Sequence, residues 1–150
     1  MKKILNLILV QGIISLISGI LLSKMSLVGK IGISVVYTEY TILKTWWKAV
    51  LLVFFIQLIL IAVLYVTKRF MIYKTFVIVN LVIVILGLLG LFFTYIDFTT
   101  TSHKYMNSKF HTGGYLVWFG WFINCIYFFI FSVKPKPIEN TNTTLNQGLN

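Results

Sequence analysis

The chain has 150 residues and a mean hydropathy of +0.93, with 59% apolar and only 11% charged residues. A soluble domain of this length is roughly half apolar and a quarter charged, so an ordinary soluble core is excluded. The formal net charge of +10 comes mainly from lysines that lie between and beside apolar runs, where they would meet anionic lipid headgroups. Because these lysines form no continuous basic face, we expect no nucleic-acid partner.

Four apolar stretches predict four transmembrane helices, and all four are free of Asp, Glu, Lys, Arg and His. Each has about 20 residues, which at ~1.5 Å per residue is enough to cross a hydrocarbon core of ~30 Å. The expected fold class is therefore an all-α integral membrane protein built as a four-transmembrane-helix bundle. The predicted helices cover residues 4–22, 49–67, 75–94 and 115–133.

The first stretch follows Lys2 and Lys3, a pattern that is also typical of secretory signal peptides. It is longer than the usual apolar region of such a peptide, and no A-x-A pattern follows it. No lipobox is possible, because the only cysteine is Cys125. We therefore expect a retained anchor in a transmembrane domain, 1–133, and a disordered polar tail, 134–150.

The connections alternate between long and short, so both termini should lie on one side of the membrane and both long connections on the other. With the termini inside, seven Lys and Arg residues lie inside and six outside, and the inner ones are denser along the chain. We predict a multi-pass plasma-membrane protein with both termini in the cytoplasm. The single cysteine excludes an intramolecular disulfide, and outer loops without disulfides are ordinary in Gram-positive bacteria. The abundance of Lys, Ile and Asn is typical of an AT-rich bacterial genome, so we expect a Gram-positive bacterium as the source.

The two long connections contain segments typical of β-strands. Residues 31–43 and 94–101 are rich in β-branched and aromatic residues with partial alternation. Two such strands could pair as a small cap over the outer end of the helices. An irregular loop in each place is an equally supported alternative.

A carboxamide lies in each predicted helix: Gln11, Gln57, Asn80 and Asn124. Three of them, all except Asn80, would lie close to the bilayer midplane. An unpaired amide is costly in hydrocarbon, so each should face the bundle interior and find a partner. The favoured interpretation is an interhelical polar network that holds the helices together. The alternative is a polar lining for a solute pathway.

Small and polar residues predict where the helices approach one another closely. Gln11, Ser15 and Ser18 form a continuous stripe on the first predicted helix, because they are four and three residues apart. Gly87 and Gly90 indicate a similar face on the third predicted helix. The second predicted helix has few small residues, so we expect it to face lipid more than the others.

Tryptophans are predicted to mark the membrane interfaces. Trp46 and Trp47 precede the second predicted helix, and Trp118 and Trp121 lie in the outer half of the fourth. Indole rings favour the headgroup region, so all four are expected to be interface anchors. Because Trp118 and Trp121 share a helix face, they could also stack on a ligand, which is the less favoured alternative.

Ionisable groups that could carry chemistry are scarce, since the chain has three acidic residues and two histidines. Asp97, His103 and His111 fall in one predicted loop and, with Glu39, are of the right types for zinc. Their spacing matches no compact ligand motif, so a solvated loop is favoured, and we expect neither a metal nor a cofactor. No H-E-x-x-H, G-x-S-x-G or P-loop pattern is present.

The expected function is therefore non-enzymatic. The chain would act by contact with the lipid bilayer and with another membrane protein or a second copy of itself, as an accessory or assembly subunit or as a toxin-immunity protein. The alternative is a small oligomeric transporter or channel subunit with an amide-lined interior. No motif in the sequence assigns the chain to a family.

Overall fold

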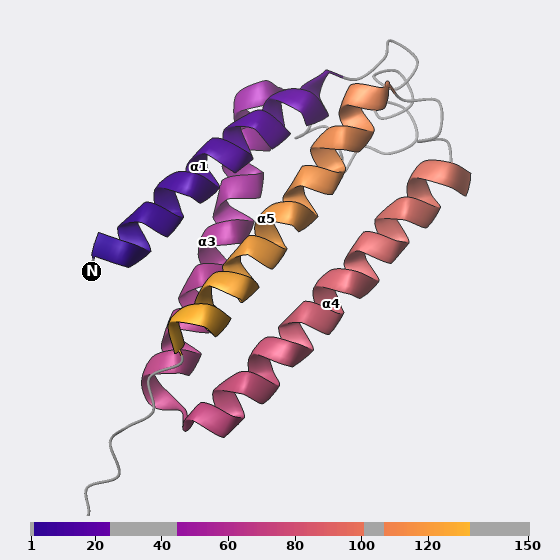
Figure 1. The fold of residues 1–150 in the computed structure, drawn as a ribbon. Helices are drawn as coiled ribbons and strands as arrows, with labels where there is room; N and C mark the ends of the chain where they lie inside the picture. The colour runs from indigo at the N-terminus through magenta and orange to yellow at the C-terminus, as the bar shows by residue number, and fades with distance from the viewer. Residues whose placement is uncertain (1, 25–44, 101–106, 133–150) are drawn as a thin grey trace, which may run out of the picture.

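The structure is a computed structural model that describes residues 2–24, 45–100 and 107–132. These residues are helical almost throughout, and no strand occurs among them. All four helices are long and apolar enough to cross a membrane, as the sequence predicts. They are α1 (Lys2–Ser23), α3 (Trp46–Phe70), α4 (Tyr73–Thr100) and α5 (Ser108–Ser132), and Figure 1 shows their arrangement.

Both alternatives for 94–101, a strand and an irregular loop, are wrong for residues 94–100, because α4 continues to Thr100. The threonines at this end are accommodated in a helix by bonding back to its own carbonyls. The hydroxyl of Thr99 donates to the Tyr95 carbonyl at 2.9 Å, and that of Thr100 donates to the Ile96 carbonyl at 2.6 Å. The other predicted strand, 31–43, and the tail, 134–150, lie outside the described residues.

The predicted start of the fourth helix at 115 is also wrong, because α5 begins at Ser108. Glycine disfavours a helix by about 1 kcal/mol, but packing overrides this preference here. A Cβ at Gly113 would lie 2.8 Å from the backbone nitrogen of Leu22, and one at Gly114 would lie 2.7 Å from the ring of Phe98. Both glycines are therefore needed where α1 and α4 press against α5.

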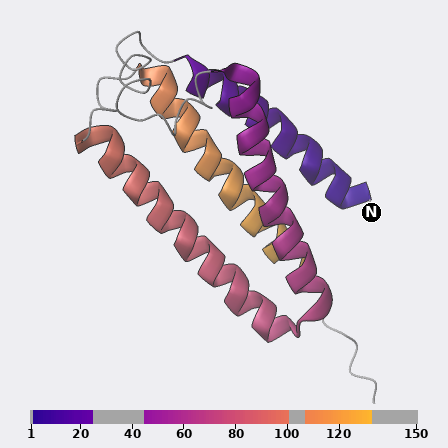
Figure 2. The ribbon, with the colours of Figure 1, turned by 180° about the vertical axis from the view of Figure 1, so that it is seen from behind.

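Successive helices run in opposite directions (Figures 1 and 2). The C-terminus of α1, the N-terminus of α3, the C-terminus of α4 and the N-terminus of α5 lie together, at what we call the long-connection end. The turn between α3 and α4 lies at the opposite end, called the turn end. Both the start of α1 and the end of α5 are at the turn end, which agrees with the even number of predicted crossings.

The helices do not contribute equally to the bundle. α1, α3 and α5 pack against one another, whereas α4 packs mainly against α5 and touches α3 only slightly. Within the described residues the backbones of α1 and α4 do not approach each other within 8 Å, because α5 lies between them. The molecule is thus a three-helix core with α4 attached at one side.

The expectation that the second predicted helix is more exposed to lipid than the other three is wrong. In its most apolar stretch α3 has 33% of its residues buried, against 17% in α4. The reason lies in the partner helix: a Cβ at Gly19 of α1 would be 2.5 Å from the backbone of Val50 in α3. Gly19, together with the fully buried Ala49 of α3, lets the two helices approach closely at this contact.

α4 leaves a long apolar face uncovered. Ile78, Ile85 and Phe92 recur every seven residues along it and are 61%, 48% and 57% exposed. Large contiguous apolar surface of this kind is rare in water and ordinary in lipid. The outer face of α4 is therefore an apolar surface that the other described helices leave uncovered.

Candidate functional site

A chain of hydrogen-bonded carboxamides joins α1, α3 and α5. The side chains of Gln11, Gln57 and Asn124 are all fully buried. Asn124 Nδ2 donates to Gln57 Oε1 at 2.8 Å, and Gln11 Nε2 donates to Asn124 Oδ1 at 2.9 Å. Asn124 of α5 therefore bridges the other two helices, and we call these three side chains the amide network.

The amide network also binds backbone carbonyls of α5. Gln11 Nε2 donates to the Gly120 carbonyl, and Gln57 Nε2 donates to the Val117 carbonyl, both at 2.9 Å. Gly120 leaves the space for this, since a Cβ there would lie 2.9 Å from Gln11 Oε1 and 3.2 Å from Gln57 Nε2. A larger residue at position 120 would push the two glutamines away.

A second polar contact repeats this arrangement one heptad away. Ser18 of α1 is fully buried, and its hydroxyl donates to the Gly113 carbonyl of α5 at 2.7 Å. Residues 11 and 18 are seven apart, as are residues 113 and 120, so the two antiparallel helices meet in one register. Sequence reasoning identified the donors on α1 but missed the two glycines on α5, although their matching spacing was a usable signal.

Asn80 is separate from the amide network. It is 2% exposed, and its Nδ2 donates to the Cys125 carbonyl at 3.2 Å, which ties α4 to α5. The four carboxamides singled out from the sequence therefore form a group of three and a group of one, rather than one ring. A further carboxamide of α1, Asn6, is exposed.

Two clusters of buried apolar side chains lie on either side of the amide network, one toward the turn end and one toward the long-connection end. Each cluster contains residues of all four helices. The first comprises Leu7, Leu60, Ile61, Leu64, Phe76, Ile83, Cys125 and Phe128, and the second Leu22, Val53, Phe98 and Phe110. The polar layer thus lies near the middle of the helices, between two apolar layers.

Three buried polar oxygens have no hydrogen-bond partner among the described residues: Gln11 Oε1, Ser15 Oγ and Asn80 Oδ1. Gln11 and Ser15 are one turn apart on α1, and both are fully buried. Each such atom loses the hydrogen bonds it would make in water, which is costly in an apolar interior. The polar layer therefore retains some unused acceptor capacity along α1.

The chemistry available to the amide network is hydrogen bonding without proton transfer, because carboxamides stay neutral at physiological pH. Interhelical bonds of this kind contribute on average about 0.6 kcal/mol each in a membrane bundle. Four bonds that converge on α5 fix the rotation and register of α1 and α3 against it. The amide network therefore favours this one packing arrangement of the three helices over others.

Trp118 and Trp121 join α4 to α5. Trp118 Nε1 donates to Thr94 Oγ1 at 2.9 Å, and Trp121 Nε1 donates to the Ile83 carbonyl at 3.1 Å. Their rings occupy the space left by two glycines of α4, since a Cβ at Gly90 would overlap the ring of Trp118 and one at Gly87 would lie 2.7 Å from that of Trp121. Both indole N–H groups are thus bonded within the bundle.

The other predicted anchors, Trp46 and Trp47, open α3 at the long-connection end and are 56% and 48% exposed. The ammonium of Lys48 lies 5.5 Å from the ring centre of Trp47. This placement at a helix end leaves both rings available to a headgroup region.

The candidate zinc set is only partly described, because His103 and Glu39 lie outside the described residues. Asp97 is on α4 and His111 on α5, where the imidazole stacks on Phe98 with ring centres 4.6 Å apart. In the part of the chain that the structure describes, no group of three or more His, Cys, Asp or Glu residues could hold a metal ion.

Comparison of the chain with protein-family models, with curated proteins and with solved structures finds no match.

Proposed function

We propose that this protein is a plasma-membrane protein of four spans, with both termini in the cytoplasm, that acts by contact and not by catalysis or transport. Its role would be that of an accessory or assembly subunit, or of an immunity protein that shields its host from a membrane-active toxin. The observation that carries the proposal is the amide network: its donors are bonded to one another and to α5, and apolar clusters lie on both sides of it.

The outer face of α4 is the surface that we propose for a partner helix. α4 is the least buried of the four helices, and Ile78, Ile85 and Phe92 give it a stripe of bulky apolar residues at heptad spacing. Heptad spacing keeps a stripe facing one neighbour along the length of a packed helix pair. A partner would bury this stripe without disturbing the contacts of α4 with α5.

Site-specific photocrosslinking in the native cell tests the proposal. A photoreactive residue at Ile85 or Phe92 should capture one discrete protein, whereas the same residue at Phe55 of α3 should capture lipid. Phe55 is a matched control, because it is 66% exposed on a different helix of the same bundle. Capture of lipid alone at the α4 positions, and also at sites in 25–44 and 101–106, would refute action by protein contact.

The second candidate function is a small oligomeric transporter or channel subunit that uses the amides as a polar lining. The unpaired oxygens of Gln11 and Ser15 favour it, since they could accept hydrogen bonds from a passing solute. Under this hypothesis Gln57→Leu and Asn124→Leu abolish flux while the protein still accumulates. Under the structural hypothesis the same changes act on stability.

A further inference from the structure

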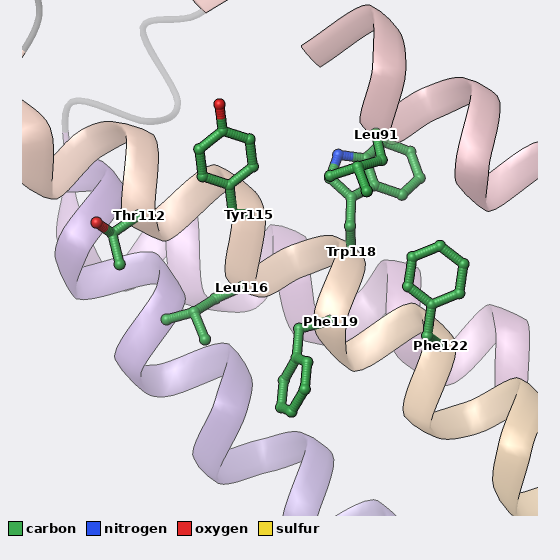
Figure 3. A pocket seen from close by; sticks show the side chains of 7 residues that line it. All are labelled: Leu91, Thr112, Tyr115, Leu116, Trp118, Phe119 and Phe122. Atoms are coloured by element: carbon green, nitrogen blue, oxygen red, sulfur yellow. The ribbon is translucent and has the colours of Figure 1, made fainter. Parts of the chain in front are cut away.

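A groove of about 450 Å³ lies on the surface of α5 beside α4. No residue of the amide network lines it. Its walls come from α5 and from one residue of α4. Figure 3 shows the side chains that line it: Leu91, Thr112, Tyr115, Leu116, Trp118, Phe119 and Phe122. A volume of this size is within the ~300–1,000 Å³ typical of small-molecule sites.

The lining of the groove suits a hydrocarbon chain. Polar atoms occur there only in Thr112, Tyr115 and Trp118, and two of these are already occupied. The Thr112 hydroxyl donates to the Ser108 carbonyl at 3.0 Å, and the Trp118 N–H donates to Thr94. Phe119 is 57% exposed, so the groove opens to the surroundings of the bundle, which for a membrane helix is lipid.

The length of the groove matches one leaflet of a bilayer. Thr112 and Phe122 are ten residues apart on α5. At ~1.5 Å per residue this is ~15 Å along the helix axis, half of a hydrocarbon core of ~30 Å. An acyl chain that entered at the long-connection end would run along the groove to about the midplane.

An exposed lysine lies one turn beyond the groove on α5. Lys109 is exposed and lies one turn before Thr112, so it continues the stripe of α5 residues that line the groove toward the long-connection end. Tyr115, which lines the groove, adds a hydroxyl, and Figure 3 shows that its oxygen points away from α5. An ammonium and a phenol above an apolar slot match a phosphate group above an acyl chain.

We infer that this groove binds one anionic phospholipid, with an acyl chain along Leu116 and Phe119 and its phosphate at Lys109. The inference rests on the membrane-spanning role proposed above and names one of the contacts through which that role is exercised. It concerns a different surface from the outer face of α4.

Lipid retention by the purified full-length protein tests the inference. The protein is taken from nanodiscs that contain phosphatidylglycerol and phosphatidylcholine in equal amounts, and its bound lipid is counted by native mass spectrometry. We expect about one retained phosphatidylglycerol per chain. Lys109→Gln should lower the preference for phosphatidylglycerol about five-fold, the factor expected for one cation at an anionic surface.

Two matched variants control this result. Lys48→Gln removes a lysine at the same end of the bundle but from α3, which contributes no residue to the groove, and it should leave the preference unchanged. Leu91→Trp fills the groove from α4 and should reduce retention of both lipids, whereas Phe55→Trp on the outer surface of α3 should not. Thermal unfolding of each variant shows whether its fold is intact.

Equal retention of the two lipids by the wild-type protein would overturn the inference, as would equal effects of Lys109→Gln and Lys48→Gln. A dimer whose partner chain crosslinks to Leu116 would also overturn it, because a second copy would then fill the groove. Failure of the lipid test with partner capture intact at Ile85 and Phe92 would refute this inference alone. Lost capture with lipid selectivity intact would refute only the proposed function.

Discussion

The hydrogen bond between Gln57 and Asn124 offers the sharpest test of how the amide network acts. At 2.8 Å between two fully buried side chains, it is the side-chain to side-chain link between α3 and α5 in the network, beside the bond from Gln57 to the Val117 carbonyl. We consider Gln57→Leu, Asn124→Leu and the double variant, since leucine keeps a similar volume and removes the polar atoms. The quantity of interest is the free energy of unfolding in a membrane-like medium.

The expected decrease in the free energy of unfolding follows from the number of hydrogen bonds lost and of buried polar atoms left without a partner. Asn124→Leu removes two interhelical bonds, worth about 1.2 kcal/mol at ~0.6 kcal/mol each. It also leaves Gln57 Oε1 buried without a partner, which costs a further ~1–3 kcal/mol. We therefore expect a destabilisation of about 2–4 kcal/mol. In the double variant the stranded oxygen is gone, so its cost is smaller than the sum of the two single changes by about 1 kcal/mol.

Unfolding of the purified chain by dodecyl sulphate in bicelles, followed by tryptophan fluorescence, measures these differences. Ser18→Ala combined with Asn124→Leu is the control cycle, because Ser18 bonds to Gly113, a full heptad away, and shares no partner with Asn124. Its two effects should add. Additive effects of Gln57→Leu and Asn124→Leu would refute the reasoning. Loss of solute flux at unchanged stability would favour the transport hypothesis.

Three further predictions concern helix packing and orientation. Gly19→Ala should destabilise the protein by about 1–3 kcal/mol, because its Cβ would lie 2.5 Å from the backbone of α3, whereas Gly12→Ala should be neutral or stabilising, since its Cβ would meet only a ring carbon at 3.8 Å. Thr94→Val should cost about 0.6 kcal/mol in the same unfolding assay, and Trp118→Phe should cost more, because it also removes ring contacts at Gly90; the double variant should cost no more than Trp118→Phe alone, because both changes remove the same bond. Thr100→Cys on a cysteine-free background should react with an impermeant maleimide in intact cells; labelling only after permeabilisation would reverse the proposed orientation.

Much of the helical architecture could be predicted because lipid imposes a simple rule. A span must satisfy its own backbone and present apolar side chains, so composition and length alone identify it. The ends of the helices are governed by other forces. Thr99 and Thr100 prefer strands on average, yet their hydroxyls bond to carbonyls one turn earlier, and Gly113 and Gly114 are held in α5 by close packing against neighbours that are distant in sequence.

The candidate site could be predicted in part for the same reason. Buried carboxamides must find partners, so Gln11, Gln57 and Asn124 could be singled out from their positions along the spans. Which helix supplies the acceptors depends on the arrangement of the helices in space. Half of the network's bonds are accepted by backbone carbonyls of α5. Every residue has a carbonyl, so the only sequence feature that marks these acceptors is Gly120, whose missing side chain leaves room for the two glutamines.

The arrangement of the bundle also indicates how a contact on α4 could matter to the rest of the molecule. α4 is joined to α5 by bonds from Trp118, Trp121 and Asn80, with both rings resting on glycines of α4. α5 in turn carries the amide network that fixes α1 and α3. A partner helix bound to the outer face of α4 would therefore lie one helix away from α5, to which every other helix is bonded. Under the proposed function, a contact on the most exposed helix would thus be linked to the centre of the bundle through the bonds between α4 and α5.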